Sequence, residues 1–382
     1  MKRKLRIYIN SNSPWSNSGY AQQLTQLVPR IRDAGYPLAI GCFYGLEGGK
    51  IELDGMTMYP KMGDAWGGDG MQYHAQDFKA DVVFSLQDIW VLNPDFIKQI
   101  NRWITILPID HDPIPPAVLQ RARMAYRIVT YSKFGQKQIE DAGLYSTYIP
   151  HTVDTSIYKP MSKEEARKKL NLPQDLYLFG MVAANKDNPP RKAFQEVMDA
   201  FKMFNQKYPK SGIYFHVLLQ QQGGFPIEEY AGLLGIKNNI FYTPVYDYLM
   251  RCDRETVNTI YNAFDCLLSP SSNEGFGVPI IEAQACGKPA IVTDFTSMPE
   301  LVVEGKTGFK VKVYQKRFSP IGSYTAYVDT NSLYNSMIDA FKNSDKMSED
   351  CRKWIVDNYD INKIFNEKWD PFLQRLEKEV YN

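Results

Sequence analysis

The 382-residue sequence lacks several features that would narrow its function at once. Net charge is nearly absent, because 44 lysines and arginines face 43 aspartates and glutamates. Such a balance gives no large basic field for a polyanion, so we see no strong sign of a nucleic-acid partner. No stretch approaches the roughly 18 uninterrupted apolar residues of a membrane-spanning helix, which leaves at most a peripheral contact with a membrane.

Cysteine is scarce and irregularly placed. The five cysteines are odd in number, and none forms the Cys-x-x-Cys spacing that is typical of zinc and disulfide sites. The N-terminus, MKRKLRIYIN, lacks the apolar region and the cleavage site of a signal peptide. We therefore expect reduced thiols and a cytoplasmic protein.

The sequence does contain strand-length apolar runs that alternate with longer helical patterns. This order predicts an α/β fold, with parallel sheets covered by helices. The expected strands are residues 5–10, 37–43, 81–85, 103–109 and 128–131, followed by 177–182, 213–219, 240–243, 266–269 and 290–293. The segment 314–330 shows neither pattern and is expected to be an irregular inserted surface loop.

The alternation restarts after an S-x-x-E capping box at residues 162–165, and 382 residues exceed one ordinary core. We therefore expect two Rossmann-like domains facing across a cleft, with a first domain over 1–160 and a second over 161–355. The hinge between them would lie near residues 160–162.

One stretch, SPSSNEGFGVPIIEAQACGKPAIVTDF at 269–295, places Glu274 and Glu282 on either side of a Gly-Phe-Gly turn. Pro279 predicts a short helix over 279–286. Because the stretch follows a strand, it belongs at the carboxyl edge of the sheet, where open α/β sheets bind ligands. A plainer interpretation also fits, since glutamate near a helix N-terminus often only complements the helix dipole.

The two glycines of that turn, Gly275 and Gly277, lack Cβ atoms, so their backbone can approach a ligand closely. The N–H groups at the start of the following helix attract an anion or sugar oxygens. The turn is therefore a candidate polar receptor, although Gly-x-Gly is also common in ordinary turns.

Residues 260–309 as a whole resemble the signature of retaining glycosyltransferase family 4, and the resemblance extends to 129–144, 149–160 and 188–204. This family has the GT-B fold, in which two Rossmann-like domains face each other and the second holds a nucleotide-sugar. The resemblance implies that 1–160 is the acceptor domain and 161–355 the donor domain. A C-terminal helix over 356–382 would pack back on the first domain, with Trp354, Phe365, Trp369 and Phe372 as anchors.

The resemblance also implies roles for the glutamates as a Glu-x7-Glu pair. Glu282 would hold the ribose hydroxyls of a nucleoside diphosphate sugar, linked to UDP or GDP. Glu274 would hold the transferred sugar, together with the turn formed by Gly275, Phe276 and Gly277. No cofactor and no metal are expected, since the nucleotide-sugar is a co-substrate.

Arg191 and Lys192 match the basic pair of the family. A diphosphate leaving group develops charge that needs positive partners, which guanidinium and ammonium groups supply. The sequence departs from the family pattern at Ala183 and Ala193, and Lys186 can substitute there. A solvated helix start is the alternative interpretation of this pair.

In the first domain, Ser18 and Gly19 occupy the place of the glycine-rich first loop of the family, although a plain strand-to-helix turn also fits. His111 stands where many members have a histidine facing the donor sugar. Asp110 and Asp112 flank it and imitate the Asp-x-Asp metal motif of another glycosyltransferase fold. We favour the histidine role.

The sequence thus predicts a retaining, metal-independent glycosyltransferase that moves a sugar to a hydroxyl acceptor: a glycan, a lipid carrier, a small molecule or a modified base. Two alternatives stay open. A glycoside hydrolase could use Glu274 and Glu282 as its carboxylates, and a non-catalytic protein could bind sugar nucleotides without transfer. Tight nucleotide binding argues against the first, and transfer or donor hydrolysis against the second.

Overall fold

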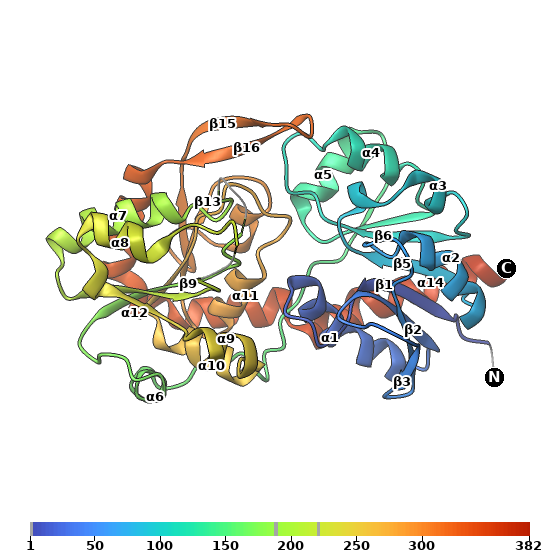
Figure 1. The fold of residues 1–382 in the computed structure, drawn as a ribbon, viewed down its shortest axis with the longest axis horizontal. Helices are drawn as coiled ribbons and strands as arrows, with labels where there is room; N and C mark the ends of the chain where they lie inside the picture. Colours follow the sequence, from blue (N-terminus) through green and yellow to red (C-terminus); the bar gives the residue numbers. More distant parts are fainter. Residues whose placement is uncertain (1–2, 187–189, 220–221) are drawn as a thin grey trace. The chain divides into compact units, whose positions relative to one another are not determined.

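The computed structural model describes residues 3–186, 190–219 and 222–382, and the chain divides into two compact units (Figure 1). The first unit comprises Met1–Thr152, Pro320–Ser323 and Ile361–Asn382. The second comprises Val153–Ser319 and Tyr324–Asp360. The divisions after residues 152 and 360 lie within several residues of the domain boundaries expected from the sequence, at 160 and 355.

The first unit is built on an eight-stranded sheet with the order β3-β4-β2-β1-β5-β6-β7-β8. Its neighbouring strands are parallel except for the β3–β4 pair. The strands are β1 Ile7–Asn12, β2 Leu38–Tyr44, β3 Ile51–Leu53, β4 Met56–Pro60, β5 Val82–Leu86, β6 Trp103–Leu107, β7 Arg127–Thr130 and β8 Thr147–Tyr148. The helices are α1 Gly19–Asp33, α2 Gly68–Phe78, η1 Ile89–Val91, α3 Pro94–Ile97, α4 Pro116–Ala122 and α5 Lys133–Asp141.

The second unit is built on a six-stranded parallel sheet with the order β11-β10-β9-β12-β13-β14. The strands are β9 Tyr177–Val182, β10 Ser211–His216, β11 Ile240–Tyr242, β12 Cys266–Ser269, β13 Ala290–Thr293 and β14 Gly308–Val311. The helices are α6 Lys163–Lys169, α7 Phe194–Lys207, α8 Ile227–Leu234, η2 Lys237–Asn239, α9 Val245–Met250, α10 Arg254–Ala263, α11 Val278–Ala285, η3 Met298–Leu301 and α12 Thr330–Tyr359. Two Rossmann-like units of this kind confirm the α/β fold prediction.

The core of the second unit follows from helical spacing. Helix α7 buries an apolar stripe at intervals of three and four residues, which packs on the sheet with apolar residues of α12. The stripe is Phe194, Val197, Met198, Phe201 and Phe204. Strand β9 contributes Gly180, where a Cβ atom would lie 2.0 Å from the Phe264 ring. A side chain at this position would therefore displace the aromatic core.

The sequence expectation for 314–330 was wrong. These residues form a two-stranded hairpin, with β15 at Val313–Ser319 and β16 at Ser323–Val328 (Figure 1). Their tyrosines, valines and threonine favour strands. All seven side chains of β15 are exposed or half-buried, so this strand lacks the buried alternation by which a strand is found.

The C-terminal region also differs in detail from the expectation. Helix α12 continues past residue 355 to Tyr359, and Trp354 on it donates its indole Nε1–H to the carbonyl of Leu301, 3.2 Å away in the second unit. Trp354 therefore belongs to the second unit and forms a hydrogen bond within it. The following segments, α13 Ile361–Ile364, η4 Phe365–Trp369 and α14 Asp370–Tyr381, belong to the first unit. There Phe365, Trp369 and Phe372 are buried as expected.

A buried ion pair fastens β9 to β12 in the second unit. Asp265, next to β12, accepts hydrogen bonds from Arg167 Nη2 at 2.8 Å, Lys163 Nζ at 2.6 Å and the Leu178 amide at 2.7 Å. The Arg167 side chain is only 1% exposed. Removal of one partner from such a pair is costly because the other charge stays buried.

We predict that Asp265→Asn lowers the free energy of unfolding by roughly 3 to 5 kcal/mol, the cost of an uncompensated buried cation. Urea unfolding followed by circular dichroism measures this change. The matched control is Asp175→Asn, because Asp175 pairs with Lys210 at 3.4 Å and both side chains are largely exposed. The control should stay close to wild type, and equal losses in both variants would contradict the role of Asp265.

Candidate functional site

The candidate site lies at the carboxyl edge of the second sheet. Strand β12 pairs in parallel with both β9 and β13, so the loops that follow these three strands leave the sheet at the same edge. The loop after β12 leads into α11, and the loop after β9 leads into α7. Residues 187–189 of the β9 loop lie outside the described residues.

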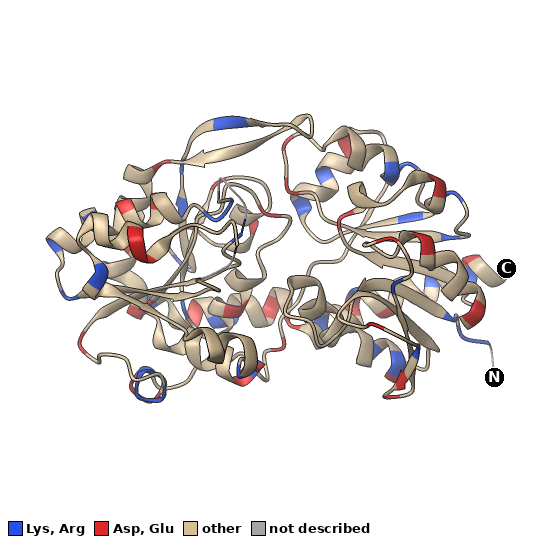
Figure 2. Ribbon diagram, in the orientation of Figure 1, with Lys and Arg blue, Asp and Glu red and all other residues tan. Residues whose placement is uncertain are grey.

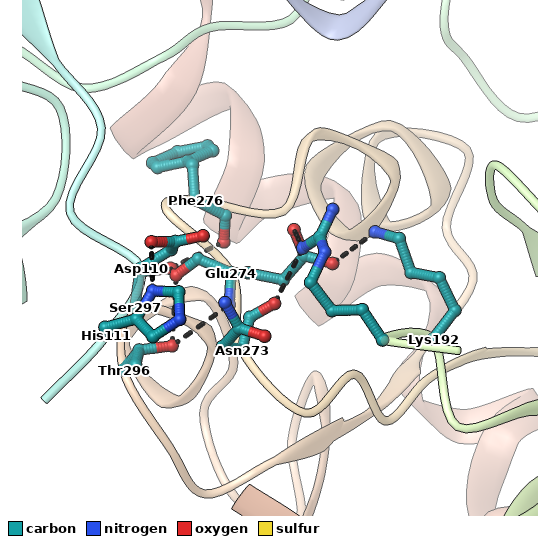
Figure 3. Close-up of polar contacts among 9 residues, drawn as sticks. Asp110, His111, Lys192, Asn273, Glu274, Phe276, Thr296 and Ser297 are labelled. Atoms are coloured by element: carbon teal, nitrogen blue, oxygen red, sulfur yellow. Dashed lines mark hydrogen bonds and ion pairs between the residues drawn. The ribbon is translucent and has the colours of Figure 1, made fainter. Parts of the chain in front are cut away.

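Glu274 is the centre of this edge, and two cations from the other loop converge on it (Figure 3). Arg191 Nη1 donates to Glu274 Oε2 at 2.9 Å, and Lys192 Nζ donates to Glu274 Oε1. Arg191 Nη1 also donates to the carbonyl of Asn273 at 2.7 Å. The Glu274 side chain keeps 11% of its surface exposed. The site therefore brings together three residues proposed from the sequence, namely Glu274, Arg191 and Lys192.

The charges of this cluster shape its titration. Burial favours the neutral form of Glu274, but Arg191 and Lys192 outweigh it and lower the pKa of the carboxyl to about 2. Burial, and then the charges of Arg191 and Lys186, lower the pKa of Lys192, although Glu274 opposes this shift. Lys186 is therefore close enough to Lys192 to add to the positive field around it.

The backbone around Glu274 is held by two hydroxyl side chains that follow β13. Thr296 Oγ1 accepts from the Glu274 amide at 3.2 Å and lies 3.0 Å from the Glu274 carbonyl. Ser297 Oγ lies 2.8 Å from the Glu274 carbonyl and 3.0 Å from the Phe276 carbonyl (Figure 3). Sequence reasoning missed both residues, although their place after the neighbouring strand was a usable signal.

In the glycine turn, position 277 requires glycine. Gly277 caps α11 with φ of +114°, and a Cβ there would lie 2.6 Å from Ile280 Cδ1. Phe276 is buried and Gly275 is half-buried. Helix α11 begins at Val278, one residue before the predicted start.

Glu282 lies on α11 in a different environment from Glu274. It is 6% exposed, and Tyr261 donates its hydroxyl to Glu282 Oε2 at 2.8 Å. Burial raises the pKa of Glu282 to about 7, even though hydrogen bonds from Tyr261 and Tyr158 oppose the rise. The two tyrosines were missed because no spacing rule links them to the glutamate.

In the first unit, Ser18 caps helix α1. Its Oγ accepts from the Ala21 amide at 3.1 Å and from Asn12 Nδ2 at 2.6 Å. Gly19 is the first residue of the helix, and a Cβ at this position would meet open space within 4 Å. The cap accounts for Ser18 structurally, and nothing within the unit requires glycine at 19.

His111 and its flanking aspartates also lie in the first unit. His111 Nδ1 lies 2.6 Å from Asp110 Oδ1, and Asp112 Oδ1 accepts from Gln138 Nε2 at 3.3 Å. Across residues 3–186, 190–219 and 222–382, no three histidine, cysteine, aspartate or glutamate side chains are grouped so that they could hold a metal ion.

Within the same ranges, no helix is long and apolar enough to cross a membrane.

The residues around Glu274 lie in a segment that matches a known protein family. Residues 162–319 match the family model described as "Glycosyl transferases group 1". The D-inositol 3-phosphate glycosyltransferase of Actinosynnema mirum is 27% identical over 166 residues, which cover 43% of this chain and 39% of that protein. The protein of the same name from Mycobacterium leprae is 29% identical over 156 residues, covering 41% and 34%. The chain therefore matches less than half the length of these two relatives.

Solved structures resemble the whole chain. Sucrose-phosphate synthase from Thermosynechococcus elongatus superposes with a TM-score of 0.79 at 15% identity, over 98% of this chain and 99% of that one. Anabaena HepE, solved in complex with UDP and glucose, gives 0.72 at 16% identity over 96% and 99%. The fold is thus that of GT-B glycosyltransferases.

We predict that Glu282 makes stability fall as pH rises. Its carboxyl titrates near 4.5 in the unfolded chain and at about 7 in the folded protein. Between these values the unfolded state ionises first, so the free energy of unfolding should drop by about 2 to 3 kcal/mol relative to Glu282→Gln. Urea unfolding of both proteins at about pH 5 and about pH 8 measures the drop.

The control for this measurement is Glu349→Gln, at an exposed glutamate of α12. It should follow wild type at both pH values. A constant difference between wild type and Glu282→Gln across the range would show that Glu282 ionises as easily in the folded protein as in the unfolded chain.

Proposed function

We propose that the chain is a retaining glycosyltransferase of family 4, which moves a sugar from a nucleoside diphosphate sugar to a hydroxyl acceptor without a metal. The observation that carries the proposal is the pairing of Arg191 and Lys192 with Glu274 at the carboxyl edge of the second sheet. The cluster lies in the segment that matches glycosyltransferases, and a neighbour in fold was solved with UDP and glucose.

Arg191 and Lys192 would bind the diphosphate. Two cations face one carboxylate, so the cluster keeps a net positive charge for an incoming anion, and Lys186 adds to it. Charge that develops on the leaving diphosphate is then met by groups already in place. These side chains would take the part that a metal ion plays in other enzymes.

Glu274 would hold the transferred sugar. An ionised carboxylate offers about four acceptor sites. Arg191, Lys192 and the side chain of Ser271 each donate to it. Among the described residues these three donors leave room for a sugar hydroxyl, and the amides of Phe276 and Gly277 would add donors beside it.

Glu282 would hold the ribose. Tyr261 and Tyr158 keep its carboxyl in one orientation, which suits recognition of two neighbouring hydroxyls. Ribose hydroxyls that donate to the carboxylate stabilise its charged form. Nucleoside binding near neutral pH would therefore release a proton from Glu282.

For the chemical step we propose attack of the acceptor from the face that the diphosphate leaves. The acceptor oxygen forms a bond to the anomeric carbon as the bond to the phosphate oxygen breaks, and the electron pair leaves with the diphosphate. The phosphate oxygen takes the acceptor's proton, so the configuration is retained. Glu274 is a poor nucleophile for a double displacement because Arg191 and Lys192 hold its charge.

The first unit would bind the acceptor, with Ser18 and Gly19 in the loop beside the sugar. His111 would face the donor sugar. Since Asp110 engages Nδ1 of the imidazole, Nε2 is the nitrogen that would meet a sugar hydroxyl. The thiols described are free, and four of the five are buried, which suits the proposed cytoplasmic location.

A glycoside hydrolase is the second candidate, because one carboxyl has a raised pKa and the other a lowered one, as in acid and nucleophile pairs. The cations on Glu274 weigh against it, since they neutralise the carboxylate that would attack. A non-catalytic sugar-nucleotide-binding protein would keep this site but show no donor hydrolysis.

The proposal is tested by calorimetric titration with UDP, GDP, ADP and their common sugars, with and without EDTA. We expect one diphosphate to bind well, EDTA to change nothing, and Lys192→Ala to weaken the diphosphate much more than the free nucleoside. The loss of a charge-assisted hydrogen bond corresponds to roughly 1.5 to 3 kcal/mol. Lys207→Ala, at the exposed end of α7, is the control. Equal weakening of nucleoside and diphosphate would refute the assignment, and binding lost with EDTA would point to a metal.

Replacement of Glu282 and replacement of Glu274 should have different effects on binding and on donor hydrolysis. Glu282→Gln should weaken free diphosphate and nucleotide-sugar alike and should abolish the proton release. Glu274→Gln frees two cations, so free diphosphate should bind as well as in wild type or more tightly, whereas donor hydrolysis should slow through lost orientation of the sugar. Dissociation constants and hydrolysis rates are measured after thermal melts confirm folding. Loss of free diphosphate binding only in Glu274→Gln would reverse the assigned roles.

A further inference from the structure

The hairpin β15–β16 has a composition unlike the rest of the chain. Between Glu304 and Asp329 the sequence contains no acidic residue, although the whole protein is almost neutral. The same stretch holds five cations, which are Lys306, Lys310, Lys312, Lys316 and Arg317. In Figure 2 the hairpin accordingly carries blue and no red.

Exposed aromatic rings accompany these cations. Tyr314 is 74% and Phe318 64% exposed on β15, and Tyr324 and Tyr327 are each 42% exposed on β16. Single exposed rings are normal on a protein surface, but this hairpin carries four, and two of them, Phe318 and Tyr324, pack against each other. The two strands form a sheet of their own, so packing against further strands does not explain the rings.

On one face of β15 a cation lies between two rings, and on the other face of the hairpin one cation lies over one ring. Because strand side chains alternate, Tyr314, Lys316 and Phe318 share one face, with about 6.7 Å between successive members. On this face Phe318 contacts the Tyr324 ring at 6.1 Å. On the other face Arg317 lies over the Tyr327 ring at 5.5 Å.

The hairpin is anchored next to the candidate site. The Ala326 amide on β16 donates to the Ser272 carbonyl at 3.0 Å, and the Ser272 amide donates to the Arg191 carbonyl at 2.7 Å. Lys316 Nζ lies 5.9 Å from the centre of the Phe295 ring, in the loop that continues to Thr296. The hairpin therefore borders the loops that hold Glu274.

We propose that the β15–β16 hairpin is a docking surface for single-stranded nucleic acid. Such a strand alternates planar bases with phosphates, and proteins bind it by stacking bases on aromatic rings and pairing phosphates with cations. The order ring, cation, ring along β15 matches that alternation. A membrane surface fits less well, because the cations interrupt both faces and leave no continuous apolar face.

A strand bound to the hairpin lies next to the loop that carries Glu274, where the acceptor of the proposed reaction belongs. That link to an acceptor rests on the proposed function. Binding itself does not, because it is measured without donor or transfer.

The test is fluorescence anisotropy of a labelled thymidine oligonucleotide of about 15 nucleotides, with the full chain and no nucleotide-sugar. We expect binding that weakens between about 50 and 200 mM salt. The double variant Lys316→Ala/Arg317→Ala should flatten the plot of log affinity against log salt by about 1.4, or 0.7 for each cation. Phe318→Ala should weaken binding about tenfold or more without changing the slope.

The control is Lys342→Ala/Lys346→Ala, which removes the same charge from exposed positions on α12 of the same unit. It should bind the oligonucleotide like wild type, and thermal melts verify that all variants fold. No binding at low salt, or equal effects of the two double variants, overturns the proposal. Hairpin-dependent binding to phosphatidylserine vesicles but not to the oligonucleotide overturns it in favour of a membrane, and binding to heparin with no loss in Phe318→Ala reduces it to general charge attraction.

Discussion

The buried carboxylate of Glu274 is the constraint on which the candidate site depends. An ionised group with so little exposure is tolerated only when opposite charges and hydrogen bonds compensate for lost water. Arg191 and Lys192 supply the charges, and Thr296 and Ser297 hold the backbone of Glu274. Glu274 and these partners come from loops that follow three different strands, so the pairing of one carboxylate holds three loops together at the edge of the second sheet.

The strands that carry these loops are the part of the fold that the sequence predicts best. The expected strands 177–182, 266–269 and 290–293 coincide with β9, β12 and β13. Buried parallel strands are short apolar runs between turn residues, so their signal is local. The partners of the glutamates are different. Tyr261 reaches Glu282 across 21 positions and Ser297 reaches Glu274 across 23, and such contacts exist only once the sheet has formed.

The sequence-based predictions were wrong where buried residues do not recur at the regular spacing of a strand or a helix. Strand β15 buries none of its side chains, so the apolar alternation of a half-buried strand does not appear in it. The second domain was expected to end at residue 355, but Asp329 caps the start of helix α12, which runs unbroken for 30 residues to Tyr359. Trp354 consequently packs within the second unit. An aromatic residue near a domain boundary shows that a core is close, but its sequence position does not say which core.

Composition misleads in the same way when it is summed over a whole chain. A net charge of +1 argues against a polyanionic partner only if the charges are spread evenly. At physiological salt a surface charge is felt over about 8 Å, so a ligand on the hairpin meets Lys316 and Arg317 and not the acidic residues of distant helices. The relevant quantity is the charge within that radius. Strands β15 and β16 contain Lys316 and Arg317 and no acidic residue, so the overall neutrality of the protein does not exclude an anionic ligand on this surface.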